Sequence, residues 1–172
     1  IEHRINTAKT RLIVTNQEQR PKLNSVDVPH ILTVYQQNTL SQQDDDFWTE
    51  LIKQSSVFEP VIQTFEDDFL MMFTSGTTGL AKSVPVPLKA VLAFKGYMTY
   101  AVDLRAEDSF WNLADPGWAY GLYYGITGPL SLGHSIIMDE RAFSVDHAVQ
   151  IIKKYKVSNL TGSPTAFRMF FG

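Results

Sequence analysis

The stretch "TSGTTGLAKSVPVP", Thr74–Pro87, decides how this part of the chain folds. It follows the apolar run "FLMMF" and divides into a loop rich in glycine and hydroxyl groups and a segment with two alternating prolines. Pro85 and Pro87 have no backbone N–H, and each disfavours helical geometry at the valine before it. Together with the β-branched valines, they predict a strand. The sequence therefore predicts a buried strand, a loop and a second strand.

The same stretch lies one residue away from a Walker A phosphate loop, G-x-x-x-x-G-K-[ST]. Gly76, Lys82 and Ser83 fit that pattern, but Ala81 stands where the second glycine belongs. In a Walker A loop a helix begins at the lysine and directs its free N–H groups at the phosphates. The prolines predict a strand at this point, which argues against a Walker A loop. A phosphate-binding module of a P-loop-like nucleoside triphosphatase remains the alternative, and a helix beginning at Lys82 would support it.

The residue types of the loop favour phosphate binding. Gly76 and Gly79 allow positive φ and a close backbone approach to an anion, hydroxyl groups supply donors, and Lys82 adds a cation. A hydrogen bond to a charged group contributes about 1.5–3 kcal/mol. Clusters of Gly, Ser and Thr also form ordinary turns, but the combination with lysine favours a ligand. The predicted phosphate-binding residues are Thr74, Ser75, Gly76, Thr77, Thr78, Gly79 and Lys82.

Composition narrows the class of protein. The 172 residues are 44% hydrophobic, enough for one sizeable core or two small subdomains. A net charge of -3 argues against nucleic acid as a partner, and the lack of cysteine excludes disulfides, thiolate catalysis and Cys-ligated zinc. The uncharged segment from Trp118 to Met138 is interrupted by Gly128, Pro129 and Gly133, so we expect no membrane span. We expect a cytoplasmic protein.

Short β-branched runs alternate with amphipathic helical windows, which predicts an α/β fold with a largely parallel sheet flanked by helices. Strands are expected at 11–16, 30–34, 70–73, 83–87, 110–115, 134–139 and 157–162, and helices at 47–52, 88–102, 120–132 and 144–156. The acidic run Asp44–Asp46 is a possible metal site, although acids also suit a helix N-terminus, which we favour. No metal site is predicted, because the four histidines show no ligand spacing.

Three segments carry a resemblance to a known family. "FTSGTTGLAK" resembles the [ST]-S-G-[ST]-T-G-x-P-K motif of the adenylate-forming (AMP-binding) superfamily, from which only Ala81 departs. "ADPGWAYGLYYGITGPLSLG" and "NLTGSPTAFRMF" resemble, in the same order, segments of acetyl-CoA and other short- to medium-chain acyl-CoA synthetases.

The resemblance implies a two-step ligase reaction. A carboxylate attacks the α-phosphate of ATP, with Mg²⁺, to give an acyl-adenylate and pyrophosphate; the thiol of CoA then displaces AMP. The loop Thr74–Lys82 would hold the β- and γ-phosphates, and Trp118 would gate the acyl site. The resemblance places the substrate pocket at Trp118, Ala119, Tyr120, Gly121, Gly162 and Ser163. The last two also fit the start of a helix with proline in its first turn.

The resemblance further implies that residues 1–172 are a partial N-terminal AMP-binding domain without the C-terminal domain. The family's adenine, ribose and magnesium motifs and its catalytic lysine lie downstream, so we expect no catalytic residue here and no adenylation by this chain alone. An adenylation domain that loads a carrier protein remains an alternative, because the acceptor is chosen largely downstream. A degenerate interaction domain without catalysis is a third alternative, against which the intact loop hydroxyls argue.

Overall fold

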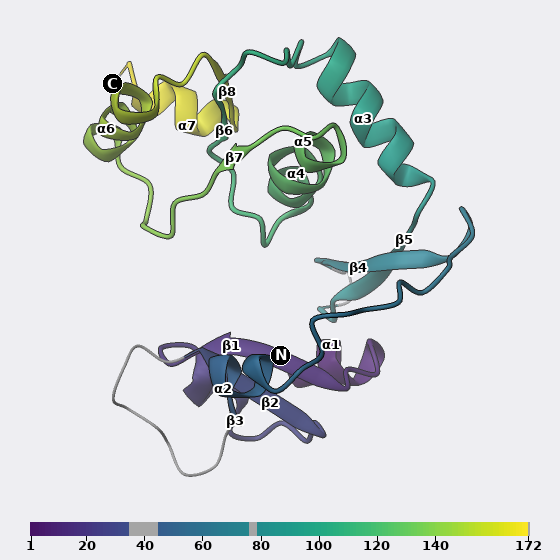
Figure 1. Cartoon of the computed structure of the whole chain (residues 1–172). Coiled ribbons are helices and arrows are strands. Elements are labelled where there is room, and N and C mark those ends of the chain that lie inside the picture. The colour runs from purple at the N-terminus through teal and green to yellow at the C-terminus, as the bar shows by residue number, and fades with distance from the viewer. Residues whose placement is uncertain (35–44, 76–78, 172) are drawn as a thin grey trace. The chain divides into compact units, whose positions relative to one another are not determined.

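The computed structural model describes residues 1–34, 45–75 and 79–171 (Figure 1). The chain divides into two compact units, Ile1–Val86 and Pro87–Gly172. Within the described residues, no helix has the length and apolar character needed to cross a bilayer.

The first unit contains a parallel sheet in the order β1-β2-β3, formed by Leu12–Asn16, His30–Val34 and Asp45–Asp46. Helix α1 (Glu2–Thr7) precedes the sheet, the 3₁₀ helix η1 (Arg20–Leu23) lies between its first two strands, and α2 (Phe47–Ile52) follows it. Thr33 on the central strand is fully buried. The predicted strands 11–16 and 30–34 and the helix 47–52 are confirmed; η1 and the short β3 were not predicted.

The acidic run before α2 has a structural role. The Asp46 carboxylate accepts a hydrogen bond of 2.7 Å from the Thr49 backbone N–H, and this bond lowers the pKa of Asp46. An aspartate in this position satisfies one of the free N–H groups of the first helical turn. The helix-terminus interpretation is therefore confirmed for Asp46, whereas Asp44 lies outside the described residues.

Strands β4 (Asp68–Thr74) and β5 (Lys82–Pro87) form a separate two-stranded sheet in the first unit. The strand–loop–strand prediction is thus confirmed. The prediction that the first of these strands is buried is wrong. Asp68 and Thr74 are exposed, and Met71 is 39% exposed. The reason is that a sheet of only two strands leaves much of the surface of each strand uncovered. On β5, Val86 is buried while Val84 and Pro85 are exposed.

The second unit contains the parallel sheet β7-β6-β8, formed by Ile136–Ile137, Phe110–Asn112 and Asn159–Thr161. Its helices are α3 (Ala90–Tyr100), α4 (Ala119–Gly121), the π-helix η2 (Leu122–Thr127), α5 (Gly128–Ser131), α6 (Val145–Tyr155) and α7 (Pro164–Met169). The two parallel sheets and their helices confirm the α/β prediction. The predicted helix 120–132 is realised as three consecutive helical segments with a π-helical centre.

Consecutive residues of β6 build two cores on opposite faces of this sheet. Phe110 packs with Met98 and Leu104, and Trp111 packs with Ala148 and Ile151. Figure 1 shows α3 to α5 on one side of β6 and α6 and α7 on the other. This arrangement follows from the two-residue period of a strand, which turns successive side chains to opposite faces.

Helix α6 has the predicted ends. The Ser144 hydroxyl accepts a hydrogen bond of 3.3 Å from the His147 backbone N–H, as expected of an N-cap. Lys156 ends the helix with φ of +50°, and Lys153 and Lys154 occupy the last turn, where the helix dipole favours cations.

A polar network joins the loop before β6 to the start of β8. The Asp108 carboxylate accepts hydrogen bonds from the Ser158 hydroxyl at 2.7 Å, the Arg105 backbone N–H at 2.9 Å and the Asn159 amide at 3.3 Å. These bonds favour the ionised form and lower the pKa of Asp108, with Ser158 contributing most. The network therefore stabilises the pairing of β6 with β8 most strongly while Asp108 is charged.

We expect Asp108→Asn to lower the free energy of unfolding by about 1 kcal/mol at pH 7, because it weakens hydrogen bonds to a charged acceptor. The native pKa is lowered, so the stability from the charge is present above the unfolded pKa of about 4 and is lost as pH falls toward the native pKa. Urea unfolding followed by tryptophan fluorescence should show this difference shrinking below pH 4. A difference that is unchanged between pH 7 and pH 3 would contradict the role of the charge.

Candidate functional site

The described ends of the predicted phosphate loop have the extended geometry that the prolines after Lys82 predicted. Thr74 ends β4, Ser75 follows it, and Lys82 is the first residue of β5. All three side chains are exposed. The predicted ligands Gly76, Thr77 and Thr78 lie outside the described residues.

Lys82 begins a strand, not a helix, and this separates the loop from a Walker A motif. A P-loop depends on a helix N-terminus directly after the lysine to bind phosphate. Here the backbone after Lys82 is extended as far as Pro87. The P-loop alternative is therefore not supported.

Gly79 has φ of +88°, a conformation that side-chain-bearing residues rarely adopt. A Cβ atom built at this position would meet no atom within 4 Å. Glycine is therefore required here by backbone conformation and not by crowding. The positive φ turns the chain just before Lys82, which supports the prediction that Gly79 shapes the loop.

The predicted acyl-site residues lie in the second unit, after two neighbouring strands. Trp118 to Gly121 follow β6 through a short loop, and Gly162 and Ser163 follow β8 directly. Because β6 and β8 are parallel, their carboxyl ends lie at the same edge of the sheet, where open α/β sheets bind their ligands. The structure thus brings the two predicted segments to one sheet edge.

Each of these residues has a distinct environment. Trp118 is 73% exposed at the start of α4, so it is not a core aromatic of this chain. The Ser163 hydroxyl accepts a hydrogen bond of 3.2 Å from the Ala166 backbone N–H, which makes Ser163 the N-cap of α7 with Pro164 in the first turn. Ala119 lies in the first turn of α4 and is exposed.

Tyr120 belongs to an aromatic cluster between α3 and the helices α4 and η2. Its ring centroid lies 5.4 Å from that of Tyr124, which stacks on Tyr97 at 4.0 Å. Burial raises the pKa of the Tyr120 hydroxyl, and the neighbouring Tyr97 hydroxyl raises it further. Tyr120 therefore stays neutral at physiological pH and can donate or accept a hydrogen bond.

Two buried polar atoms lie close to this edge. Asn112 Nδ2 has no hydrogen-bond partner within the described part of the chain. The Thr161 hydroxyl interacts with the Tyr120 hydroxyl, a hydrogen bond that opposes the rise in the Tyr120 pKa. Asn112 and Thr161 are opposite each other in the β6–β8 register, each at the last position of its strand. An unpaired buried polar atom is costly, so the Asn112 amide marks a place where a polar group of a ligand or water would be favoured.

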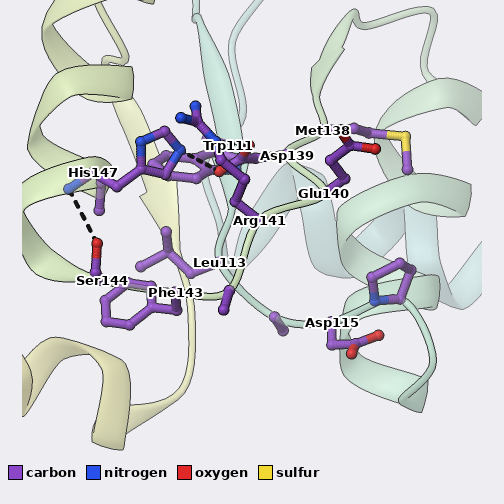
Figure 2. Close-up of a pocket in the computed structure, with 14 residues that line it drawn as sticks. Trp111, Leu113, Asp115, Met138, Asp139, Glu140, Arg141, Phe143, Ser144 and His147 are labelled. Carbon is purple, nitrogen blue, oxygen red and sulfur yellow. Dashed lines mark hydrogen bonds and ion pairs between the residues drawn. The ribbon is translucent and has the colours of Figure 1, made fainter. Parts of the chain in front are cut away.

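A cavity of the second unit lies beside this edge and was not predicted from the sequence (Figure 2). It lies between the loop after β6, the segment after β7 and the start of α6, and includes Trp111, Asp115, Phe143 and His147. Figure 2 shows His147 turned toward Asp139. Trp118, Tyr120, Gly162 and Ser163 do not line it.

Asp139 links the segment after β7 to α6 at the wall of this cavity. Its carboxylate forms a hydrogen bond with the His147 ring and an ion pair with Arg141, whose Nε lies 3.2 Å away. Burial alone would raise the pKa of Asp139, but the hydrogen bonds from Arg141 and His147 outweigh it and lower the pKa. Among the described residues, no three His, Cys, Asp or Glu side chains are grouped to hold a metal ion.

Comparison with known proteins identifies the family. The family model described as "AMP-binding enzyme" matches residues 1–172. This chain belongs to that family.

Individual members of the AMP-binding family agree with this assignment. Acetyl-coenzyme A synthetase of Bacillus subtilis (strain 168) is 28% identical over 100% of this chain and 31% of its own length. The crystal structure of Brucella canis acyl-CoA synthetase has a TM-score of 0.92 and 46% identity, covering 99% of this chain and 31% of that one. An anthranilate CoA ligase in complex with anthranoyl-AMP shares the fold, with a TM-score of 0.87 at 21% identity, covering 96% of this chain and 33% of that one. The chain spans about a third of the length of these relatives.

The closest backbone approach in the predicted acyl site is at Gly121. A Cβ atom there would lie 2.2 Å from the Asp115 carbonyl oxygen and 2.7 Å from that of Ala114. Both are backbone atoms, so they cannot yield by a side-chain rotation. Only a residue without a side chain at position 121 therefore allows the loop from Ala114 to Trp118 to lie this close to α4.

We expect Gly121→Ala to destabilise the second unit by about 1–3 kcal/mol, the usual cost of overpacking, because the Asp115 backbone must move. Gly96→Ala on α3 is the matched control, since a Cβ there meets no atom within 4 Å and alanine favours a helix by about 1 kcal/mol. Urea unfolding of both variants should give shifts of opposite sign. Equal stability of the two variants would contradict the role of Gly121.

Proposed function

We propose that the protein carrying this chain activates a short- or medium-chain carboxylic acid with ATP and transfers the acyl group to CoA. The observation that carries the proposal is the donor-rich loop that joins β4 to a strand beginning at Lys82, in a chain of the AMP-binding family. The named acetyl-CoA and acyl-CoA synthetases among its relatives support the ligase class. We also propose that residues 1–172 form part of the larger N-terminal domain of such an enzyme.

In the first proposed step, a carboxylate oxygen of the acid attacks the α-phosphorus of ATP and the bond to the β-phosphate oxygen breaks. An acyl-adenylate forms, and pyrophosphate leaves with its charge held by Lys82 and the loop donors. Such a reaction depends on positioning and charge stabilisation, which hydroxyl groups, backbone N–H groups and a lysine supply. Mg²⁺ would arrive with the phosphates of ATP.

In the second proposed step, the CoA thiol adds to the acyl carbon and AMP leaves, giving a thioester. The acyl group would occupy the carboxyl ends of β6 and β8, beside Trp118, Tyr120 and Gly162. The ring of Tyr120 takes up volume at this edge, which supports a small acyl group. A structural neighbour with the same fold holds anthranoyl-AMP, an intermediate of this chemical kind.

The direct test is acid-dependent exchange of labelled pyrophosphate into ATP by the full-length protein, with acids from acetate to octanoate. We expect exchange that requires one acid or a narrow range of acids. Hydrolysis of ATP to ADP and phosphate without exchange would contradict the proposal. A second assay separates the acceptors: CoA-dependent AMP release supports a CoA ligase, and release only with a carrier protein supports an adenylation domain.

We expect Lys82→Ala to lower the pyrophosphate exchange rate by about 10- to 150-fold, the effect of losing about 1.5–3 kcal/mol from one hydrogen bond to a charged phosphate. Lys153→Ala, in the exposed last turn of α6, serves as the control of equal charge change. A similar small loss in both variants would mean that Lys82 acts only through the net charge of the protein.

A further inference from the structure

Helix α1 contacts both strands that carry the phosphate loop. His3 Nε2 lies 2.9 Å from the carbonyl oxygen of Ala81, the residue directly before β5. The next residue, Arg4, places its guanidinium 5.8 Å from the ring centroid of Phe73, one residue before the end of β4. Two consecutive residues of one helix therefore reach the end of one strand and the start of the other.

The chemistry of the His3 contact is unambiguous. A carbonyl oxygen only accepts hydrogen bonds, so Nε2 must carry the hydrogen. The Thr7 hydroxyl donates a hydrogen bond of 2.7 Å to the His3 carbonyl, which ties His3 to the next turn of α1. The contact at Ala81 therefore comes from a residue that is itself held on the helix.

The two strands need such support. A two-stranded sheet on its own is at best marginally stable in water, and β4 and β5 pair only with each other among the described residues. Ala81 is adjacent to Lys82, so a shift of its peptide group moves the start of β5 and the lysine with it. The Arg4–Phe73 contact is weaker than the hydrogen bond of His3. It is an exposed cation–π pair, and its distance is close to the limit of about 6 Å at which such pairs act.

We propose that His3 is a positioning residue for the phosphate loop, holding the Ala81 peptide so that Gly79 and Lys82 meet the phosphates of MgATP, with Arg4 supporting the other strand. This inference rests on the proposed function for the identity of the ligand. The contact itself does not depend on that function. His3 touches neither phosphate nor substrate and acts through the backbone of the loop.

The test uses the full-length protein with His3→Ala, His3→Gln and His30→Ala. Gln keeps a side-chain N–H donor, and His30 is an exposed histidine at the start of β2. We expect His3→Ala to weaken MgATP binding, measured by calorimetry, by about 2- to 10-fold, the range for one hydrogen bond. His3→Gln should recover most of this loss, and His30→Ala should bind as the parent protein does.

A second measurement separates this inference from the proposed function. Without nucleotide, His3→Ala should speed amide hydrogen exchange at residues 79–83, while His30→Ala should not. Unchanged exchange, or faster exchange with unchanged MgATP affinity, would overturn the positioning role. Absence of pyrophosphate exchange in the parent protein would refute the proposed ligase instead, and the hydrogen-exchange result would still decide the contact.

Discussion

The second unit depends on two adjacent side chains of β6 that must be buried on opposite faces of one sheet. Phe110 is 1% exposed and Trp111 is 5% exposed, and each is the centre of a separate hydrophobic cluster. Burying a large aromatic side chain contributes about 1.5–3 kcal/mol, and both burials require helices on both faces. The same strand then ends at Asn112, next to the last residue of β8. The packing that stabilises the unit therefore also sets the edge at which the acyl site is proposed.

Much of this architecture could be predicted because it is local. Strand β2, helix α2 and the cap of α6 depend on periodicity, on an acidic N-cap and on Ser144, all of which are visible within a few residues. The prolines after Lys82 predicted an extended backbone, because the constraint is covalent. The π-helix η2 was not predicted, because the residue pattern of 120–132 indicates a helix but not which helical hydrogen-bond pattern its centre adopts.

In the candidate site, too, the local features could be predicted from the sequence and the contacts between elements could not. The residue types of the phosphate loop are evident in the sequence, and so is the need for glycine at position 79. The role of Gly121 was evident only in part: it was predicted to line the acyl pocket, which stays a prediction, and the structure adds that a Cβ atom there would meet the Asp115 backbone. The hydrogen bond of His147 with Asp139 was also missed, because the two residues belong to different elements and no sequence pattern pairs them.

A phosphate loop of this kind faces two opposing requirements. It needs glycine and short polar side chains to approach phosphate, and these same residues provide little packing to hold it in place. The structure supplies the missing packing at the ends of the loop, where the residues do not need to be glycine or short polar side chains. Phe73 and Ala81 are partly buried and are contacted by Arg4 and His3, 69 and 78 positions earlier in the chain. Because these contacts fall beside the loop, we expect them to hold its ends without occupying the donors proposed to bind phosphate.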